Sequence, residues 1–160
     1  SLANPDQRSN RARYSVMEAD FKIGLAHPVI GVGKGLRSSY MPDYFSEKAF
    51  QNGEVKMWLS FREKLGIMRS GFPGLGEYTT RFAESGILGL GIFLLPIVVL
   101  LRKLYRKLKM SKDKMPYIAF TVSFCGILAA GIGDSLNITY CYWFLLGLGY
   151  AMCVDARKVK

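Results

Sequence analysis

Three long apolar runs, separated by short polar connectors, constrain the fold of this chain more than any other feature. They cover residues 86–101, 117–133 and 138–154 and hold 16 or 17 residues each. A bilayer core needs about 20 helical residues, with a range of about 17–25, so each run with its flanks can cross it. No polar stripe of helical period interrupts the runs, which argues against buried helices of a soluble protein. The sequence predicts an all-α integral membrane protein, with an extracytoplasmic helical loop domain followed by three transmembrane helices.

Basic residues indicate the topology. The connector 102–114 holds seven Lys/Arg and one Asp, the tail 155–160 holds three Lys/Arg, and the connector 133–137 holds none. Short loops rich in Lys and Arg stay in the cytoplasm. Most of the net charge of +10 reflects this bias, and attraction to membrane lipid explains it without a nucleic-acid partner. We therefore predict an extracytoplasmic loop with amphipathic helices at 1–77, transmembrane helices at 78–105, 116–133 and 138–154, a basic cytoplasmic loop at 106–115, a short outer loop at 134–137 and a cytoplasmic tail at 155–160.

Two amphipathic helices are expected in the outer segment. The first is capped by Ser9 or Asn10, begins near Arg11 and ends before the proline of His27-Pro28. Its predicted apolar face contains Tyr14, Met17, Phe21, Gly24 and Leu25. The second covers 54–69, with Trp58, Phe61, Leu65 and Met68 on one face. This face either lies on the outer leaflet or packs against the protein's own membrane domain, and the sequence leaves both open.

Several residues near the membrane surface are candidates for chemistry. Glu77, Arg81 and Glu84 have spacings of four and three, so they share one face at the start of a long helix that begins at Tyr78. Gly31 and Gly33 would let backbone N–H groups approach an anion, but no G-K-[ST] motif follows, so a nucleotide site is not expected. The three cysteines lie in apolar runs without C-x-x-C spacing, and neither a metal, a disulfide nor a cofactor is predicted.

Two motifs resemble a known family. The first is Arg13 followed after fourteen residues by His27-Pro28 and then V-I-G-V-G. The second begins with Tyr78 and runs into A-E-S-G-I-L-G-L at 83–90, the head of the first predicted span. In order, spacing and placement, the pair resembles the O-antigen ligase and O-antigen polymerase family of bacterial surface-polysaccharide enzymes. The resemblance covers residues 13 to about 101 and flanks the family's large extracytoplasmic loop.

The resemblance implies a metal-independent, inverting glycosyltransferase in the bacterial cytoplasmic (inner) membrane, multi-pass, with a cytoplasmic C-terminus. Its substrate would be an undecaprenyl-diphosphate-linked glycan, and chain-length regulator and flippase proteins would be partners. Arg13 matches the motif's arginine, which neutralises the leaving diphosphate, a role that suits the guanidinium group. The predicted substrate-binding residues are Arg13, Tyr78, Arg81, Glu84, Gly31 and Gly33; all except Arg81 lie in the two motifs. We further expect additional spans before Ser1, without which this stretch alone is inactive.

One departure from the family concerns the general base. Ligases of the family carry His-Asn three residues before the motif tyrosine, where this chain has Leu75-Gly76. Leucine cannot accept a proton, so the departure favours a polymerase of lipid-linked repeat units, with Glu77 as a candidate catalytic base. The single histidine, His27, is interpreted as structural. A ligase and a non-enzymatic transport or structural subunit remain alternatives, although a transporter would carry ionisable residues within its spans.

Overall fold

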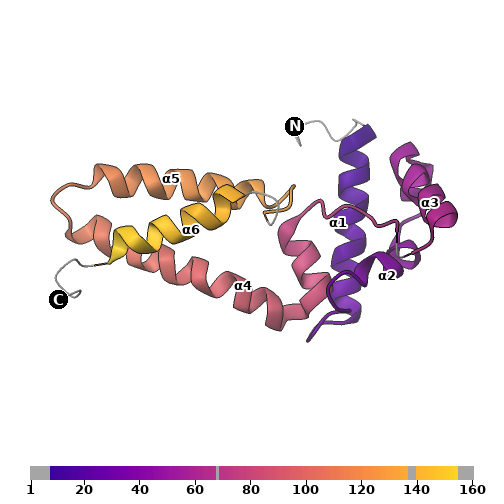
Figure 1. The fold of residues 1–160 in the computed structure, drawn as a ribbon, viewed down its shortest axis with the longest axis horizontal. Coiled ribbons are helices and arrows are strands. Elements are labelled where there is room, and N and C mark those ends of the chain that lie inside the picture. The colour runs from indigo at the N-terminus through magenta and orange to yellow at the C-terminus, as the bar shows by residue number, and fades with distance from the viewer. Residues whose placement is uncertain (1–7, 68, 137–139, 155–160) are drawn as a thin grey trace. The chain divides into compact units, whose positions relative to one another are not determined.

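The computed structural model describes residues 8–67, 69–136 and 140–154, and within these ranges it contains helices and no strand (Figure 1). The all-α prediction is confirmed for this part of the chain. In chain order the elements are α1 (Arg8–Ala26), α2 (Arg37–Tyr44), the short 3-10 helix η1 (Ala49–Gln51), α3 (Gly53–Leu65), α4 (Glu77–Met110), α5 (Met115–Ala130) and α6 (Tyr140–Cys153). The chain forms two compact units, unit 1 (Ser1–Leu90) and unit 2 (Gly91–Lys160).

Of the described helices, α4 is long and apolar enough to cross a membrane. It has 34 residues, and its most apolar 18-residue window has a mean hydropathy of 2.2. The core helix of a soluble protein would be mostly buried, whereas 17% of this window is buried. By length and composition, α4 therefore fits the first predicted span better than a soluble core. It extends beyond the predicted 78–105 at both ends, from Glu77 to Met110.

The helices at the second and third predicted spans are shorter than 116–133 and 138–154. α5 has 16 residues and α6 has 14, or roughly 24 and 21 Å of helix against a bilayer core of about 30 Å. α5 ends at Ala130, with Gly131 as its C-cap, and the amides of Ile132 and Gly133 bond back to Ala129 O and Ala130 O in a turn. The basic loop shrinks to 111–114 because α4 continues to Met110. Residues 137–139 and the predicted tail 155–160 lie outside the described residues.

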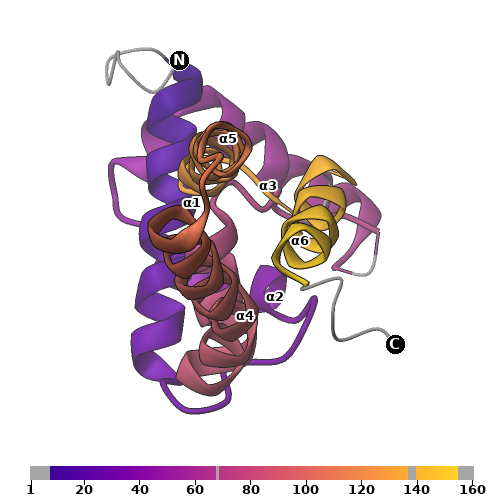
Figure 2. The ribbon, with the colours of Figure 1, turned by 90° about the vertical axis from the view of Figure 1, so that its left-hand side faces the viewer.

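The buried stripe of α1 differs from the predicted one. Small and β-branched residues form it at spacings of four, three and four: Ala12, Val16, Ala19 and Ile23. The large side chains of Tyr14, Phe21 and Leu25 are 45–58% exposed, so the predicted apolar face is wrong at these three positions. Gly24 is buried, and Met17 is partly buried. α2 and α3 both pack against α1 (Figures 1 and 2), and small side chains permit close approach. The predicted caps Ser9 and Asn10 are wrong because both already lie within α1.

A proline explains how α2 is joined to α3. Pro42 lies inside α2 and has no N–H, so the carbonyl of Ser38 lacks its usual helical partner. Arg62 of α3 supplies it: its Nη1 donates to Ser38 O, and its Nη2 donates to Ser39 O at 3.2 Å. Arg62 therefore replaces a backbone donor that the sequence of α2 removes.

The bounds of α3 follow from ordinary capping. Asn52 accepts a hydrogen bond from the amide of Glu54 at 2.8 Å, and Gly66, with φ of 77°, ends the helix. The predicted 54–69 helix is thus correct at its start and too long at its end. Trp58 packs on the core of unit 1, where its ring lies 6.3 Å from that of Phe72. Phe61 and Leu65 are exposed, and the side chain of Met68 lies outside the described residues.

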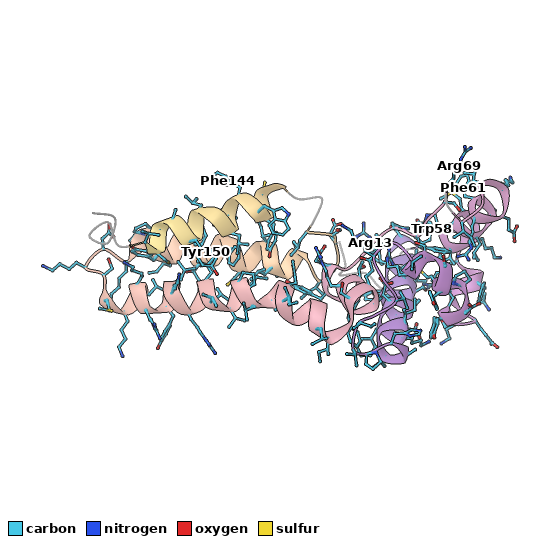
Figure 3. The ribbon with its side chains drawn as sticks, turned by 60° about the horizontal axis from the view of Figure 1, so that its bottom comes forward. Arg13, Trp58, Phe61, Arg69, Phe144 and Tyr150 are labelled. Carbon is cyan, nitrogen blue, oxygen red and sulfur yellow. The ribbon has the colours of Figure 1, made fainter. Side chains whose placement is uncertain are left out.

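Unit 2 is held by apolar packing of α4, α5 and α6. Its buried residues are Ile97, Leu100, Leu104, Phe120, Phe124, Leu136 and Tyr142. Gly149 of α6 permits close contact, since a Cβ there would lie 2.7 Å from Phe120 and 2.8 Å from Leu100. Figure 3 shows Tyr150 on the inner side of α6, where its hydroxyl donates to Pro96 O at 2.8 Å, and Phe144 pointing outward. Helices packed through a glycine and aromatic rings, with apolar residues outside, suit a lipid environment.

Candidate functional site at the head of the apolar helix

α4 is broken at Gly86, within the second sequence motif. Gly86 has φ of 62° and ψ of −164°, a backbone region that essentially only glycine adopts. A Cβ at this position would lie 2.3 Å from the carbonyl oxygen of Val29. Gly86 therefore serves two needs at once, an unusual backbone angle and a close approach by the backbone of another segment.

The segment that approaches is the loop of the first motif, residues 28–35, here called the docking loop. In a continuous helix Ile87 N would bond Ala83 O, and Leu88 N would bond Glu84 O. The break frees all four groups, and the docking loop satisfies them. The hydrogen bonds are Val32 N to Ala83 O (3.0 Å), Gly33 N to Glu84 O (2.8 Å), Ile87 N to Pro28 O (2.8 Å) and Leu88 N to Val29 O (3.3 Å). The two motifs are therefore interlocked by their backbones.

This junction accounts for Gly31 and Gly33, two predicted substrate-binding residues. Both have positive φ, of 67° and 97°. The amide of Gly31 donates to His27 O at 3.0 Å, and that of Gly33 donates to Glu84 O. In this arrangement the N–H group of Gly33 serves the junction and that of Gly31 closes the turn after α1, so both already have an acceptor within the protein. His27, interpreted as structural, also contacts the ring of Tyr40 edge-on at 5.5 Å between centroids.

A buried ion pair lies beside the junction. Nη1 of Arg37 donates to Oδ1 and Oδ2 of Asp20 at 2.7 and 3.0 Å, and its Nη2 donates to Phe72 O at 2.8 Å. The hydroxyl of Thr80 donates to Asp20 Oδ2 at 3.0 Å. Burial raises the pKa of the Asp20 carboxyl above its ordinary value of 3.8, and Arg37 opposes that rise. This pair connects α1, α2 and α4, and a guanidinium so engaged holds the fold instead of meeting a ligand.

Glu84 connects the ion pair to the docking loop. Its Oε1 accepts the amide of Gly35 at 3.0 Å and lies 3.8 Å from Nε of Arg37. Glu84 was predicted as a substrate ligand, and the structure places its carboxylate where it holds the end of the docking loop.

The other predicted residues lie one and two turns earlier on α4. Glu77 is buried, and its Oε1 accepts from Nε of Arg81 at 2.7 Å, as the i,i+4 spacing indicated. The Arg81 side chain stays 25% exposed, and Tyr78 between them is partly buried. Arg81 therefore occupies Oε1 of this carboxylate.

Arg13 lies on α1, partly exposed and seven residues before Asp20 (Figure 3). Seven residues are close to two helical turns, or roughly 10 Å, so Arg13 and Asp20 share one side of α1. Thr80 contacts Asp20, and Phe82 contacts Gly24 on that same side. Arg13 therefore points along the side of α1 that faces the first turns of α4.

Two surface grooves of unit 1 lie on other faces. One of about 640 Å³ is lined by residues of α1 and of the η1 region: Arg11, Tyr14, Ser15, Glu18, Ser46, Lys48, Gln51, Asn52 and Gly53. Another of about 320 Å³ lies beside Trp58, Phe61 and Arg69, which Figure 3 shows gathered at α3. Neither groove is lined by a residue predicted to contact substrate. Among the described residues no group of three His, Cys, Asp or Glu side chains could hold a metal ion.

The structure thus joins the two motif segments but gives several of their residues an internal role. Neither Asp20 nor Arg37 was predicted as a site residue from the sequence. Asp20 carried a signal, because a carboxylate lies four residues after Val16 and three before Ile23, within the buried stripe. Nothing local identified Arg37 as its partner, 17 residues away. Comparisons with models of known protein families, with curated proteins and with solved structures found no match.

Proposed function

We propose that this chain forms part of a membrane glycosyltransferase that polymerises undecaprenyl-diphosphate-linked oligosaccharide repeat units. The observation that carries the proposal is the junction between the docking loop and the break of α4. The two segments on which the family resemblance depends are distant in sequence, and they are joined by four backbone hydrogen bonds. A loop held at the head of an apolar helix is a suitable place to receive a lipid-linked sugar.

In this proposal the reaction needs positive charge near the leaving diphosphate and a base near the acceptor. Arg13 and Arg81 supply the charge, because both are partly exposed and a guanidinium forks onto phosphate oxygens. An acceptor hydroxyl attacks the anomeric carbon, the bond to the diphosphate oxygen breaks, and the configuration inverts. When Arg81 turns to the diphosphate, Glu77 is released to take the proton of the hydroxyl. Arg37 stays with Asp20 and holds the docking loop in position.

The membrane arrangement is proposed as three spans, with residues 1–77 outside the bacterial cytoplasmic membrane and the C-terminus inside. α4 alone has the length for a full crossing among the described helices. α5 and α6 are apolar and pack on α4 in unit 2, so we infer that they cross with it, their ends extended by flanking turns or met by local thinning of the bilayer. In this arrangement the basic connector after α4 lies on the cytoplasmic side, as short loops rich in Lys and Arg do.

The test replaces Arg13 with Ala in the full-length protein of the native host. Arg11→Ala is the matched control, because Arg11 lies on a different side of the same helix and lines the larger groove. The proposal expects at least a tenfold loss of long polysaccharide chains on a gel for Arg13→Ala, little change for Arg11→Ala, and equal protein levels for both. Unchanged chain length in Arg13→Ala would contradict it.

The same gels separate the alternatives. A ligase defect would leave full-length polymer attached to the undecaprenyl lipid, whereas a polymerase defect leaves single repeat units. The proposed role of Glu77 as catalytic base is tested by Glu77→Gln. This variant should abolish polymer synthesis and retain substrate binding, since glutamine keeps the shape of the side chain but does not accept a proton. Full polymer synthesis by Glu77→Gln would remove Glu77 from the reaction.

A further inference from the structure

The tip of the docking loop is apolar and exposed. Val29 and Ile30 are 56% and 73% exposed, and Ile30 is among the most exposed aliphatic side chains of unit 1. Across the junction, Ile87 and Leu88 are 63% and 56% exposed. Four large aliphatic side chains in water are unfavourable, and patches of this kind mark contact with a membrane or another protein.

Backbone hydrogen bonds place these four residues together. Leu88 N bonds Val29 O, and Ile87 N bonds Pro28 O, the residue before Val29. Ile87 and Leu88 are also the first large apolar residues of the run 86–101, which belongs to the candidate span α4. The loop tip is therefore held beside the residues at which the apolar helix begins.

We propose that the tip of the docking loop, Val29 and Ile30, enters the bilayer beside the head of α4 and anchors unit 1 to the lipid surface. If α4 crosses the membrane, its first apolar turn lies near the boundary between acyl chains and head groups, and the loop tip is held at the same depth. Lys34 follows the tip by four residues and is exposed, which suits the anionic head groups of that layer. The inference rests on the proposed membrane crossing of α4 and is independent of the proposed catalysis.

We assign lipid, and not a second copy of the chain, as the partner of the loop tip because the tip is continuous with the first apolar turn of α4. The first apolar turn of a membrane span is surrounded by lipid. A loop that is hydrogen-bonded to this turn is therefore also in contact with lipid, and no second protein is needed to cover it. The junction also fixes the tip through main-chain contacts and glycines of positive φ, so insertion requires no rearrangement of the loop. Apolar residues beside basic ones are also the combination by which amphipathic helices bind the interface of an anionic membrane.

The experiment measures the depth of a spin label at position 30. Cys125, Cys141 and Cys153 are replaced by Ala in the full chain, and Ile30→Cys is labelled and reconstituted in phosphatidylcholine–phosphatidylglycerol vesicles. Collision rates with oxygen and with a water-soluble nickel chelate report lipid and water, respectively. Matched labels at Leu95, an exposed residue of α4, and at Glu47, an exposed residue between α2 and η1, report the span and the aqueous surface.

The inference expects the label at 30 to collide with oxygen several-fold more often than with the nickel chelate, as at 95, and the reverse at 47. If the label at 95 is in lipid while that at 30 is as open to nickel as that at 47, the loop anchor is wrong and the span stands. If the label at 30 is shielded from both reagents, a protein covers the tip and the lipid assignment is wrong. If the label at 95 meets nickel freely, α4 does not cross and both proposals fail.

Discussion

Each of the two units of this chain is stabilised internally by a different kind of contact. Unit 1 depends on directional polar contacts at few positions: the buried Asp20–Arg37 pair, the arginine that replaces a donor in α2, and the backbone junction at Gly86. Unit 2 depends on side-chain packing around Phe120, Phe124 and their neighbours, with apolar residues also on its outside. Backbone hydrogen bonds therefore hold the loop of unit 1 in one arrangement, whereas the ends of packed side chains in unit 2 can shift. Substitutions should therefore be far more damaging at the polar contacts of unit 1.

The largest effect is expected from Arg37→Met. It leaves the buried Asp20 carboxylate without the guanidinium that contacts both of its oxygens. Breaking a buried ion pair by removing one member costs about 3–5 kcal/mol of unfolding free energy. Denaturant unfolding of the full chain in detergent, followed by circular dichroism, measures it. The double variant Asp20→Leu with Arg37→Met should recover much of the loss. A loss below about 1 kcal/mol for Arg37→Met would mean that the pair is not buried in solution.

The second largest loss of stability is expected at one of two glycines of α4, and the other glycine serves as its control. Gly86→Ala forces an L residue into a glycine backbone region and sets its Cβ against backbone atoms of Val29, which cannot move aside. The strain alone costs about 1–3 kcal/mol, and the docking loop should also detach. Gly91→Ala is the control, since a Cβ there has open space; removing a helical glycine leaves stability equal or slightly higher. Equal behaviour of the two variants in the same unfolding assay would refute the break.

A glycine of unit 2 should behave differently. Gly149→Ala also meets close atoms, but these are the far ends of the Phe120 and Leu100 side chains, which can shift. We expect the free energy of unfolding to fall by about 1 kcal/mol, the low end for overpacking. Gly147→Ala has open space and should be neutral. Thermal midpoints of both variants measure the difference, and a cost for Gly149→Ala above that of Gly86→Ala would reverse the comparison between the units.

The loss of unfolding free energy in Arg37→Met should depend on pH, and this dependence tests the Asp20–Arg37 pair more finely. Burial raises the pKa of Asp20 above 3.8, so the folded state binds this proton more tightly than the unfolded state. Unfolding free energy therefore falls as pH rises from the ordinary pKa through the raised one. Without Arg37 the pKa rises further, and the cost of the variant should grow with pH by up to about 1.4 kcal/mol per unit of added shift. Unfolding of both proteins between about pH 4 and 7 measures this, and a cost that falls with pH would contradict it.

The smallest effect is expected at the surface of unit 1. Lys22 and Glu18 form an i,i+4 pair at 2.6 Å with side chains 43% and 50% exposed. Exposed pairs of this kind contribute about 0.3–0.5 kcal/mol. Glu18→Gln should therefore shift the thermal midpoint only slightly, and less so at high salt. A shift as large as that of Arg37→Met would show that exposure, and not burial, decides the strength of polar contacts here.

The sequence predicted the elements better than their contacts. Proline and glycine indicated the end of α1 and the irregular stretch before α4, because these residues act through their own backbone. The spacing of apolar residues indicated the position of α3. The face of α1 was mispredicted because size was taken as the sign of burial, while α2 and α3 pack close enough to favour Ala12 and Ala19. The partnership of Asp20 with Arg37 and the break at Gly86 were not predictable locally, since each depends on a distant segment.

Amide hydrogen exchange at Val32 and Gly33, in the full chain reconstituted in lipid, tests the central claim most directly. Both amides belong to the docking loop, and both donate to carbonyls of α4 freed by the break. The structure predicts slow exchange at these two positions, comparable to the middle of α1, and fast exchange at both in Gly86→Ala. Exchange in the unaltered chain as fast as in the irregular segment 73–76 would contradict the junction and the site built on it.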